Sequence, residues 1–388
     1  MTASARPRLA LALVVAATLL GLMGTDLVLP AVPSLPETLG GDPAEAQLVL
    51  AAYVGGTSVG LIAFGALGDR FATRTLVAAS LLLTGLASFA CAAASGIWAL
   101  IGLRTLQGAA AAGPAVFAPA IVRAMFEERR AVRALGALGS IESMAPALAP
   151  ILGVWLLDLG GWPLSFELIG GLALALAALS LTVPLIPQTS RRERGSYARL
   201  LGDPVYVRYA LSQAFVLGGL LVFVFGAPAV LVRRFGGTLT DFIVMQVSGI
   251  AAFILAANFA GALAARFGAE RMILTGTLLA TAGAAATLGY ALAGGASALA
   301  VTALFVPVGA GLGLRGPPGF YCAVIASRGD DARGSALVIL AIMAATAGGT
   351  AIVAPFIERG LVPLAAAALV LQLAALACLL LLPKLAES

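Results

Sequence analysis

The sequence predicts an all-α membrane protein with twelve transmembrane helices in two pseudo-symmetric six-helix bundles. Hydrophobic residues make up 61% of the chain and charged residues only 11%, a balance typical of a protein whose main solvent is lipid. A charged loop, Gly65–Arg74 (GALGDRFATR), returns 196 residues later as Gly261–Arg271 (GALAARFGAER). Because that spacing is about half the chain, we expect two similar halves in tandem.

The first bundle contains six apolar segments, and each can cross a bilayer core, which needs about 20 residues of helix. Their predicted bounds are 9–32, 45–67, 75–94, 97–121, 134–157 and 164–187. Residues 1–8 (MTASARPR) resemble the start of a signal peptide, but the apolar run continues past Leu29. We therefore expect a retained first helix.

The second bundle is predicted from six further segments, at 205–231, 241–265, 271–292, 297–324, 334–355 and 361–383. Helices are expected because every backbone group must find its partner within the lipid. The polar linker Gln188–Pro204 separates the predicted domains, 1–187 and 205–388.

The basic residues predict the orientation of the chain. Of the 23 Arg and Lys residues, 18 fall on the side of the N-terminus, 3 fall on the opposite side and 2 lie within helices. Basic loops stay on the cytoplasmic side. We therefore expect a multi-pass protein of the inner membrane with both termini in the cytoplasm.

The sequence lacks the residues that several classes of function require. There is no histidine, and the three cysteines sit in apolar segments without metal or redox spacing. Neither H-E-x-x-H nor a P-loop is found, so we expect no enzyme, no metal and no cofactor. The net charge of +5 is spread over loops beside the membrane, which argues against a nucleic-acid partner. A channel is disfavoured because no segment repeats a filter-like sequence.

The repeated loop is the first candidate site. Its candidate residues are Gly65, Gly68, Asp69, Arg70 and Arg74. The glycines let helices approach closely, and the charges can latch the two bundles in one state. A loop that only ends a helix and fixes topology is the alternative. In the second copy Ala265 replaces Asp69, so an acidic partner is missing there.

Two acidic residues lie within predicted helices, where a charged group costs about 2.5–3.5 kcal/mol on insertion scales. Asp26 is a candidate for proton or substrate binding, since burial favours the neutral carboxyl group. Alternatively it caps the kink at Pro30. Glu142 is a candidate proton carrier, or a structural partner of an arginine such as Arg104.

Arg315 lies within the tenth segment, just before Gly316 and two prolines. Because a guanidinium does not lose its proton, it needs a carboxylate, an anionic substrate or a route to the membrane edge. All three explanations remain open. Gln213, Gln246 and Asn258 are weaker candidates, since such residues more often form hydrogen bonds between helices.

Several motifs resemble one known family, the major facilitator superfamily. Gly65–Arg74 resembles its loop motif G-x-L-[AS]-D-R-x-G-R-[RK], with departures at Ala72 and Thr73. The run Arg104-Thr-Leu-Gln107-Gly108 is similar to its R-x-x-Q-G motif. Residues 25–33 (TDLVLPAVP) and 149–153 (APILG) resemble the Bcr/CflA branch of drug:proton antiporters, as do Gly311-Leu-Gly313 and Arg333-Gly-Ser335.

The resemblance implies a proton-coupled exporter of a small, drug-like molecule or metabolite that works by alternating access. It implies a substrate or proton role for Asp26, and for Arg104 a role in proton transfer or in holding a carboxylate, with Gln107 beside it. Glu142 and Arg315 depart from the branch. An anionic metabolite bound by Arg315 is therefore the alternative substrate. We expect a monomer in the lipid bilayer.

Overall fold

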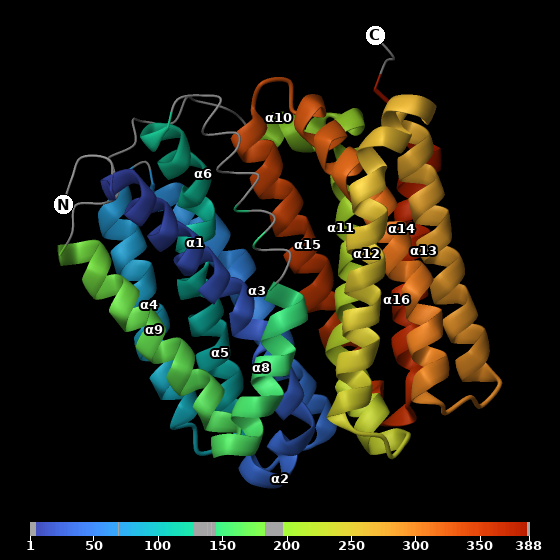
Figure 1. Cartoon of the computed structure of the whole chain (residues 1–388), viewed down its shortest axis with the longest axis horizontal. Helices are drawn as coiled ribbons and strands as arrows, with labels where there is room; N and C mark the ends of the chain where they lie inside the picture. The colour runs from blue at the N-terminus through green and yellow to red at the C-terminus, as the bar shows by residue number, and fades with distance from the viewer. Residues whose placement is uncertain are drawn as a thin grey trace. The chain divides into compact units, whose positions relative to one another are not determined.

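The computed structural model describes residues 5–68, 70–126, 145–182 and 197–385, together with Leu138 and Ile141. Every regular element in these ranges is a helix and none is a strand, so the predicted all-helical fold is confirmed. The chain divides into two compact units, unit 1 (Met1–Glu193) and unit 2 (Arg194–Ser388). Figure 1 draws unit 1 in blue to green and unit 2 in yellow-green to red.

Unit 1 consists of long helices with short connections. Its elements are α1 (Ala5–Asp26), η1 (Leu29–Ser34), α2 (Leu35–Leu39), α3 (Pro43–Leu67), α4 (Thr73–Ala92), α5 (Ile97–Ala111), α6 (Gly113–Met125), α8 (Ala145–Gly160) and α9 (Trp162–Thr182).

Unit 2 is built in the same way. Its elements are α10 (Tyr197–Gly202), α11 (Pro204–Pro228), η2 (Ala229–Arg234), α12 (Leu239–Phe267), α13 (Ala269–Leu292), α14 (Ala298–Ala326), α15 (Asp331–Val353), η3 (Ala354–Arg359) and α16 (Leu361–Leu381).

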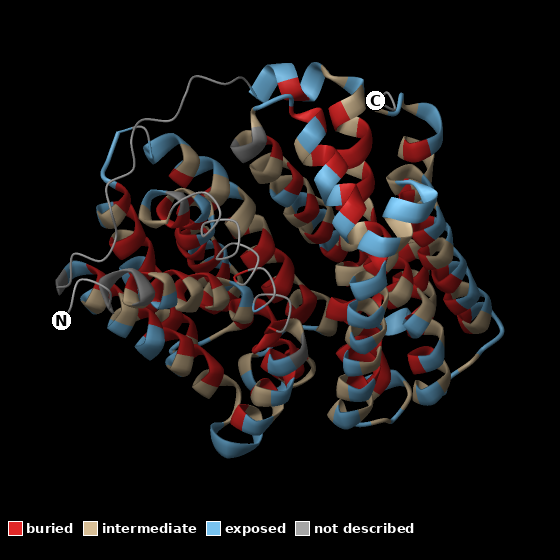
Figure 2. Cartoon of the chain, turned by 45° about the horizontal axis from the view of Figure 1, so that its top comes forward, coloured by how far each residue is buried: buried red, intermediate tan, exposed pale blue. Residues whose placement is uncertain are grey.

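Eleven helical segments of the described ranges are long and apolar enough to cross a membrane, and Leu148–Gly160 is a shorter apolar helix. That shorter helix overlaps the predicted segment 134–157, part of which lies outside the described residues. Many large apolar side chains point away from the helix bundles, as expected of surfaces that face lipid. They include Trp98, Trp155, Leu255, Phe259 and Leu380. Figure 2 shows the buried faces between the helices of each unit.

Prolines mark the places where the long helices change form. The α-helical part of the first segment ends at Asp26, and Leu29–Ser34 follows as a 3-10 helix that contains Pro30 and Pro33. A proline lacks the backbone N–H that an α-helix needs. In unit 2, α11 ends at Pro228 and continues as the π-helix η2.

Glycines allow the tightest helix crossings in both units. A Cβ atom at Gly108 of α5 would lie 2.0 Å from the carbonyl oxygen of Tyr53 in α3. Likewise, a Cβ atom at Gly309 of α14 would lie 2.2 Å from the carbonyl oxygen of Gly249 in α12. Only glycine permits such a close backbone approach. The pair α3 and α5 thus packs in the same way as the pair α12 and α14.

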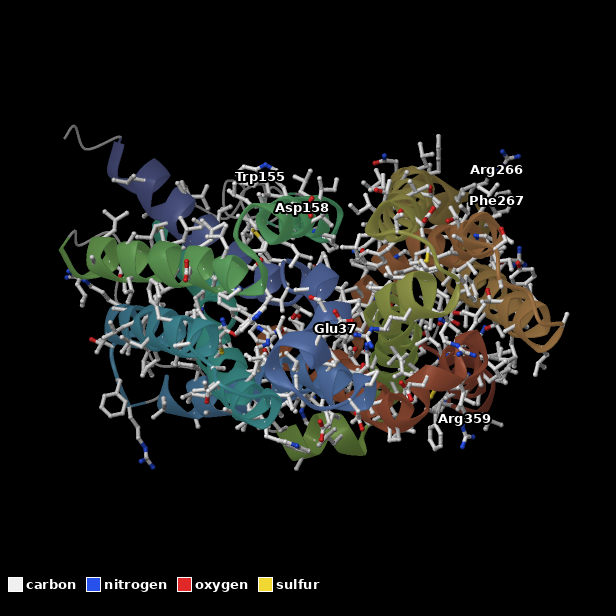
Figure 3. The ribbon with its side chains drawn as sticks, turned by 90° about the horizontal axis from the view of Figure 1, so that it is seen from below. Glu37, Trp155, Asp158, Arg266, Phe267 and Arg359 are labelled. Carbon is white, nitrogen blue, oxygen red and sulfur yellow. The ribbon has the colours of Figure 1, made fainter. Side chains whose placement is uncertain are left out.

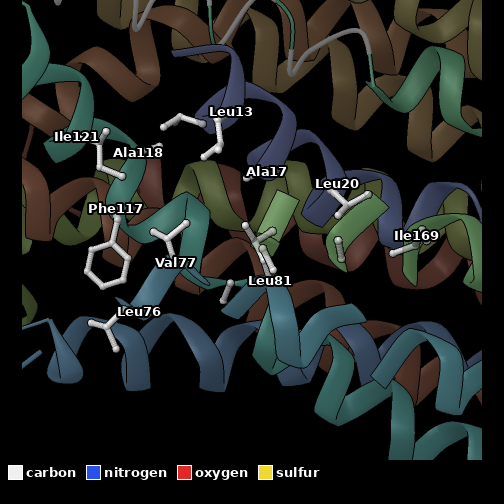
Figure 4. Close-up of a cluster of buried hydrophobic side chains, with 14 of the residues drawn as sticks. Leu13, Ala17, Leu20, Leu76, Val77, Leu81, Phe117, Ala118, Ile121 and Ile169 are labelled. Carbon is white, nitrogen blue, oxygen red and sulfur yellow. The ribbon is translucent and has the colours of Figure 1, made fainter. Parts of the chain in front are cut away.

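The apolar core of unit 1 is formed mainly by α1, α4, α6 and α9, and Phe64 of α3 and Ala149 and Leu156 of α8 also belong to it. Figure 4 shows Leu13, Ala17 and Leu20 of α1 among side chains of the other three helices. Those partners are Leu76, Val77, Leu81, Phe117, Ala118, Ile121 and Ile169. This core leaves the polar residues of α3, α4 and α5 to form a separate cluster.

Candidate functional site

Arg104 of α5 is the centre of the polar cluster in unit 1. Its side chain is fully buried, and its guanidinium donates to the carbonyl oxygens of Val49 (3.3 Å) and Gly24 (2.9 Å). The guanidinium carbon also lies 4.2 Å from the ring centroid of Tyr53. A cation over an aromatic face is stabilised by the ring electrons. Arg104 thereby connects α1, α3 and α5.

Gln107 extends this cluster toward α4. Its Oε1 accepts a hydrogen bond from Arg104 Nη1 at 2.7 Å, and its Nε2 donates to Ser88 Oγ at 2.7 Å. Ser88 in turn donates to the carbonyl oxygen of Thr84. The predicted neighbour relation of Arg104 and Gln107 is therefore present, at a spacing of three residues along one helix face.

Asp26 lies at the end of α1 and is 8% exposed. Its carboxylate makes no hydrogen bond or ion pair with the described residues, so the structure does not show it capping the kink at Pro30. Arg104 donates to the carbonyl oxygen of Gly24, two residues before Asp26. Arg104 Nη2 is buried and has no hydrogen-bond partner. A carboxyl group without a counter-charge and a donor without an acceptor thus belong to one region of unit 1.

Arg315 of α14 is fully buried in unit 2. Its Nη1 donates to the carbonyl oxygen of Ser212 at 2.8 Å, and its Nη2 donates to Ser212 Oγ at 3.0 Å. No Asp or Glu of the described residues pairs with it. Extension of the side chain to the membrane edge is wrong as an explanation, because the guanidinium points at α11.

The structure describes only some of the residues predicted to form the latch between the two bundles. Asp69 lies outside the described residues, as does Glu142. Gly68 ends α3, where an added Cβ would lie 3.0 Å from Phe117 Cε1. Arg74 Nε donates to the carbonyl oxygen of Ser180 at 2.9 Å, at the end of α9.

Three other members of the repeated loop lie at surfaces. In unit 1, Gly65 is half-buried near the end of α3, and Arg70 is exposed in the turn that follows. In the second copy, Arg266 packs over the ring of Phe267, 5.2 Å from its centroid, and Figure 3 shows both at the outside of unit 2.

One cluster in unit 2 was not predicted from the sequence. Arg208 of α11 forms an ion pair of 2.7 Å with Glu270 of α13 and donates to the carbonyl oxygen of Leu382 at 2.7 Å. Tyr209 also donates to Glu270. The one available signal was that Arg208 falls inside the predicted segment 205–231.

The profile of the Major Facilitator Superfamily matches residues 14–355. Together with the two helical units, this match shows that the chain belongs to that superfamily of multi-pass membrane transport proteins.

Similar curated proteins include drug-resistance proteins, which confirms the resemblance to the Bcr/CflA branch. A chloramphenicol resistance protein of Pseudomonas aeruginosa is 31% identical over 69% of this chain and 64% of its own length. A bicyclomycin resistance protein homolog of Haemophilus influenzae is 23% identical over 64% of this chain and 65% of its own length. The chain thus matches slightly less than two thirds of the length of these relatives.

Two solved structures share the fold over nearly the whole chain. A D-xylose-proton symporter superimposes with a TM-score of 0.72 at 16% identity, covering 96% of this chain and 97% of its own. An inward-facing bacterial homolog of the human lysosomal transporter Spinster gives 0.70 at 16% identity, covering 98% and 95%. At this level of identity, the likeness concerns the fold alone.

Proposed function

We propose that this protein exports a small, drug-like molecule in exchange for protons by alternating access. It would act as a monomer in the inner membrane, with both termini in the cytoplasm, and release its solute chemically unchanged. The drug-resistance relatives support this class of substrate. The observation that carries the proton coupling is the buried carboxyl group of Asp26, which has no counter-charge among the described residues.

Asp26 and Arg104 provide a way to couple proton binding to a movement of α1. A carboxyl group held away from water is less costly to bury when it carries its proton. When the proton leaves, the carboxylate needs a partner, and Arg104 Nη2 is a buried donor that lacks an acceptor. Because Arg104 is already bonded to Gly24, the new pair would pull the end of α1 toward α5.

Drug transport in inverted membrane vesicles tests this proposal, with chloramphenicol as the probe because a relative is named for resistance to it. We expect Asp26→Asn to abolish uptake driven by a proton gradient, while exchange of labelled for unlabelled drug continues. Asp158→Asn is the control, since Asp158 is an exposed carboxylate near the end of α8 (Figure 3). Glu142→Gln tests the second candidate carboxylate.

The two carboxylate variants decide between outcomes. If Asp26→Asn and Glu142→Gln both keep uptake that depends on the proton gradient, proton coupling through these groups is wrong. If only Glu142→Gln loses it, the carrier is Glu142 and the role given to Asp26 fails. Loss of exchange together with uptake in Asp26→Asn would instead assign Asp26 to substrate binding.

A further inference from the structure

The guanidinium of Arg315 has one edge in use and one edge free. An arginine presents five N–H donors in a rigid planar fork. Both Nη atoms donate to Ser212, so the edge formed by the two Nη groups faces α11. The Nε atom is buried and has no hydrogen-bond partner. The second edge, made of Nε and its neighbouring Nη, is therefore available to an acceptor with two oxygens.

The charge of Arg315 is also uncompensated. Both of its acceptors belong to one neutral residue, Ser212, and no carboxylate of the described residues pairs with it. A buried cation without an anion is strongly unfavourable compared with the same cation in a pair. Any anion that reaches the free edge would therefore stabilise unit 2.

A second polar group lies beside Arg315. Gln213 of α11 is 7% exposed, and its Oε1 has no hydrogen-bond partner. A Cβ atom at Gly319 would lie 3.2 Å from Gln213 Oε1 and 3.6 Å from Arg315 Nη2. Gly319 thus places no side chain between the two, and because even a single Cβ atom would be in tight contact with Gln213 Oε1, a ligand reaches this gap only when α14 moves. Rotation of the Gln213 amide by 180° would turn its NH₂ donor into that space.

We propose that Arg315, Gln213 and the space at Gly319 form a binding site for the carboxylate group of a small organic acid. The carboxylate takes the free edge of Arg315 through two parallel N–H···O bonds, the geometry that arginine provides and lysine does not. The amide of Gln213 donates to the carboxylate or accepts from a hydroxyl group beside it. That this acid is a transported solute rests on the proposed transport function; binding itself does not.

The sequence of α14 supplies a means of access. Pro317 and Pro318 follow Arg315 within the helix and provide no backbone N–H. The carbonyl groups one turn earlier therefore lack their usual donors, which makes this stretch the easiest place for α14 to bend. A bend here would move Gly319 relative to α11 and open the space beside Arg315.

Unfolding of the full chain, purified in detergent, tests the site without any transport. A maleimide dye reports unfolding through Cys91, Cys322 and Cys378, of which the first two are buried and the third is partly buried. The probe is sodium acetate, compared with sodium chloride at equal ionic strength and with the neutral isostere acetamide. A ligand that binds only the folded state raises the midpoint with the logarithm of its concentration. We expect a rise of about 3–6 °C at tenfold excess over the dissociation constant.

Three substitutions locate the effect. Arg315→Gln removes the cation, and Gly319→Ala fills the space while the cation stays. Both variants should lose the acetate shift. Gly316→Ala is the matched control, because a Cβ there meets only Phe253 Cε2 at 3.9 Å, and it should keep the shift.

Each outcome has a definite meaning. An acetate shift that survives in both Arg315→Gln and Gly319→Ala would overturn the proposal, as would an equal shift with acetamide. An equal shift with chloride would assign the edge to any anion and refute the carboxylate site. If acetate does not shift the midpoint of the unsubstituted protein, the carboxylate site is also refuted. Asp26→Asn should keep the acetate shift, so failure of proton coupling and failure of this site are distinguishable.

Discussion

The close crossing of α3 and α5 gives a sharp prediction at Gly108. A Cβ atom added there would lie 2.0 Å from the carbonyl oxygen of Tyr53, 2.8 Å from its carbonyl carbon and 3.0 Å from its Cα. All three atoms are backbone, so no side chain can rotate away. The helices must separate by about 1 Å before the contact reaches even 3.0 Å, and overpacking of this kind costs roughly 1–3 kcal/mol. Gly108→Ala should therefore destabilise unit 1.

Gly102 is the matched control on the same helix. No atom lies within 4 Å of a Cβ built at Gly102, so Gly102→Ala meets no obstacle. Alanine is favoured over glycine in a helix by up to about 1 kcal/mol. Both substitutions raise the helix propensity of α5 equally, but only Gly108→Ala introduces a steric clash. We expect the free energies of unfolding of the two variants to differ by the clash alone, about 1–3 kcal/mol.

The thiol-reactive dye also serves here, because Cys91 is fully buried in the neighbouring helix α4. For a unit of this size, 1 kcal/mol corresponds to roughly 2–4 °C, so the midpoints should be about 2–12 °C apart. Unit 2 offers an independent repeat with Gly309→Ala against Gly289→Ala, which has open space. Equal midpoints for Gly108→Ala and Gly102→Ala would show that the glycine crossing does not hold α3 and α5 together.

Two further predictions concern the ends of the last helix in each unit. Arg74→Ala removes the donors to the last turn of α9 and should cost about 1–2 kcal/mol in the same dye assay; the exposed Arg70→Ala should leave the midpoint unchanged, and an equal loss in both would remove the capping role. Glu270→Gln leaves the buried Arg208 without its carboxylate and should lower the midpoint by an amount equivalent to about 1–3 kcal/mol. A midpoint unaffected by Glu270→Gln would show that backbone carbonyls alone satisfy Arg208.

The positions of the helices could be predicted from the sequence because hydropathy reports on the lipid directly. The prolines marked the breaks after Asp26 and at Pro228, but not their form. A 3-10 turn follows the first and a π-helix the second. The choice depends on which neighbours accept the freed backbone groups, and a single sequence does not contain that information.

The partners of the buried arginines were harder to predict, for a physical reason. A carboxylate partner was one of the explanations that the sequence left open for Arg104 and for Arg315, since opposite charges are visible in a sequence. Among the described residues both arginines donate to neutral groups: Arg104 to the carbonyl oxygens of Val49 and Gly24, and Arg315 to Ser212. Arg104 Nη2 and Arg315 Nε keep no hydrogen-bond partner there. Every residue carries a carbonyl oxygen, so composition cannot reveal which one an arginine uses. The type of residue at these sites was predictable, whereas its partner depended on the fold.

In both units an arginine donates to the carbonyl groups at the end of the last helix, but the arginine comes from a different position in each unit. In unit 1, Arg74 at the start of α4 donates to the last carbonyl oxygens of α9. At the repeat spacing of 196 residues, Glu270 takes the place of Arg74, and the arginine that follows it, Arg271, is exposed. In unit 2 Arg208 of α11 donates to the end of α16 instead. Glu270, next to Arg271 in sequence, holds Arg208 in place. Unit 2 thus caps its last helix from α11, and its copy of the loop carries Ala265 where the first copy has Asp69. A charged latch, if the loop forms one, therefore depends on the first copy alone.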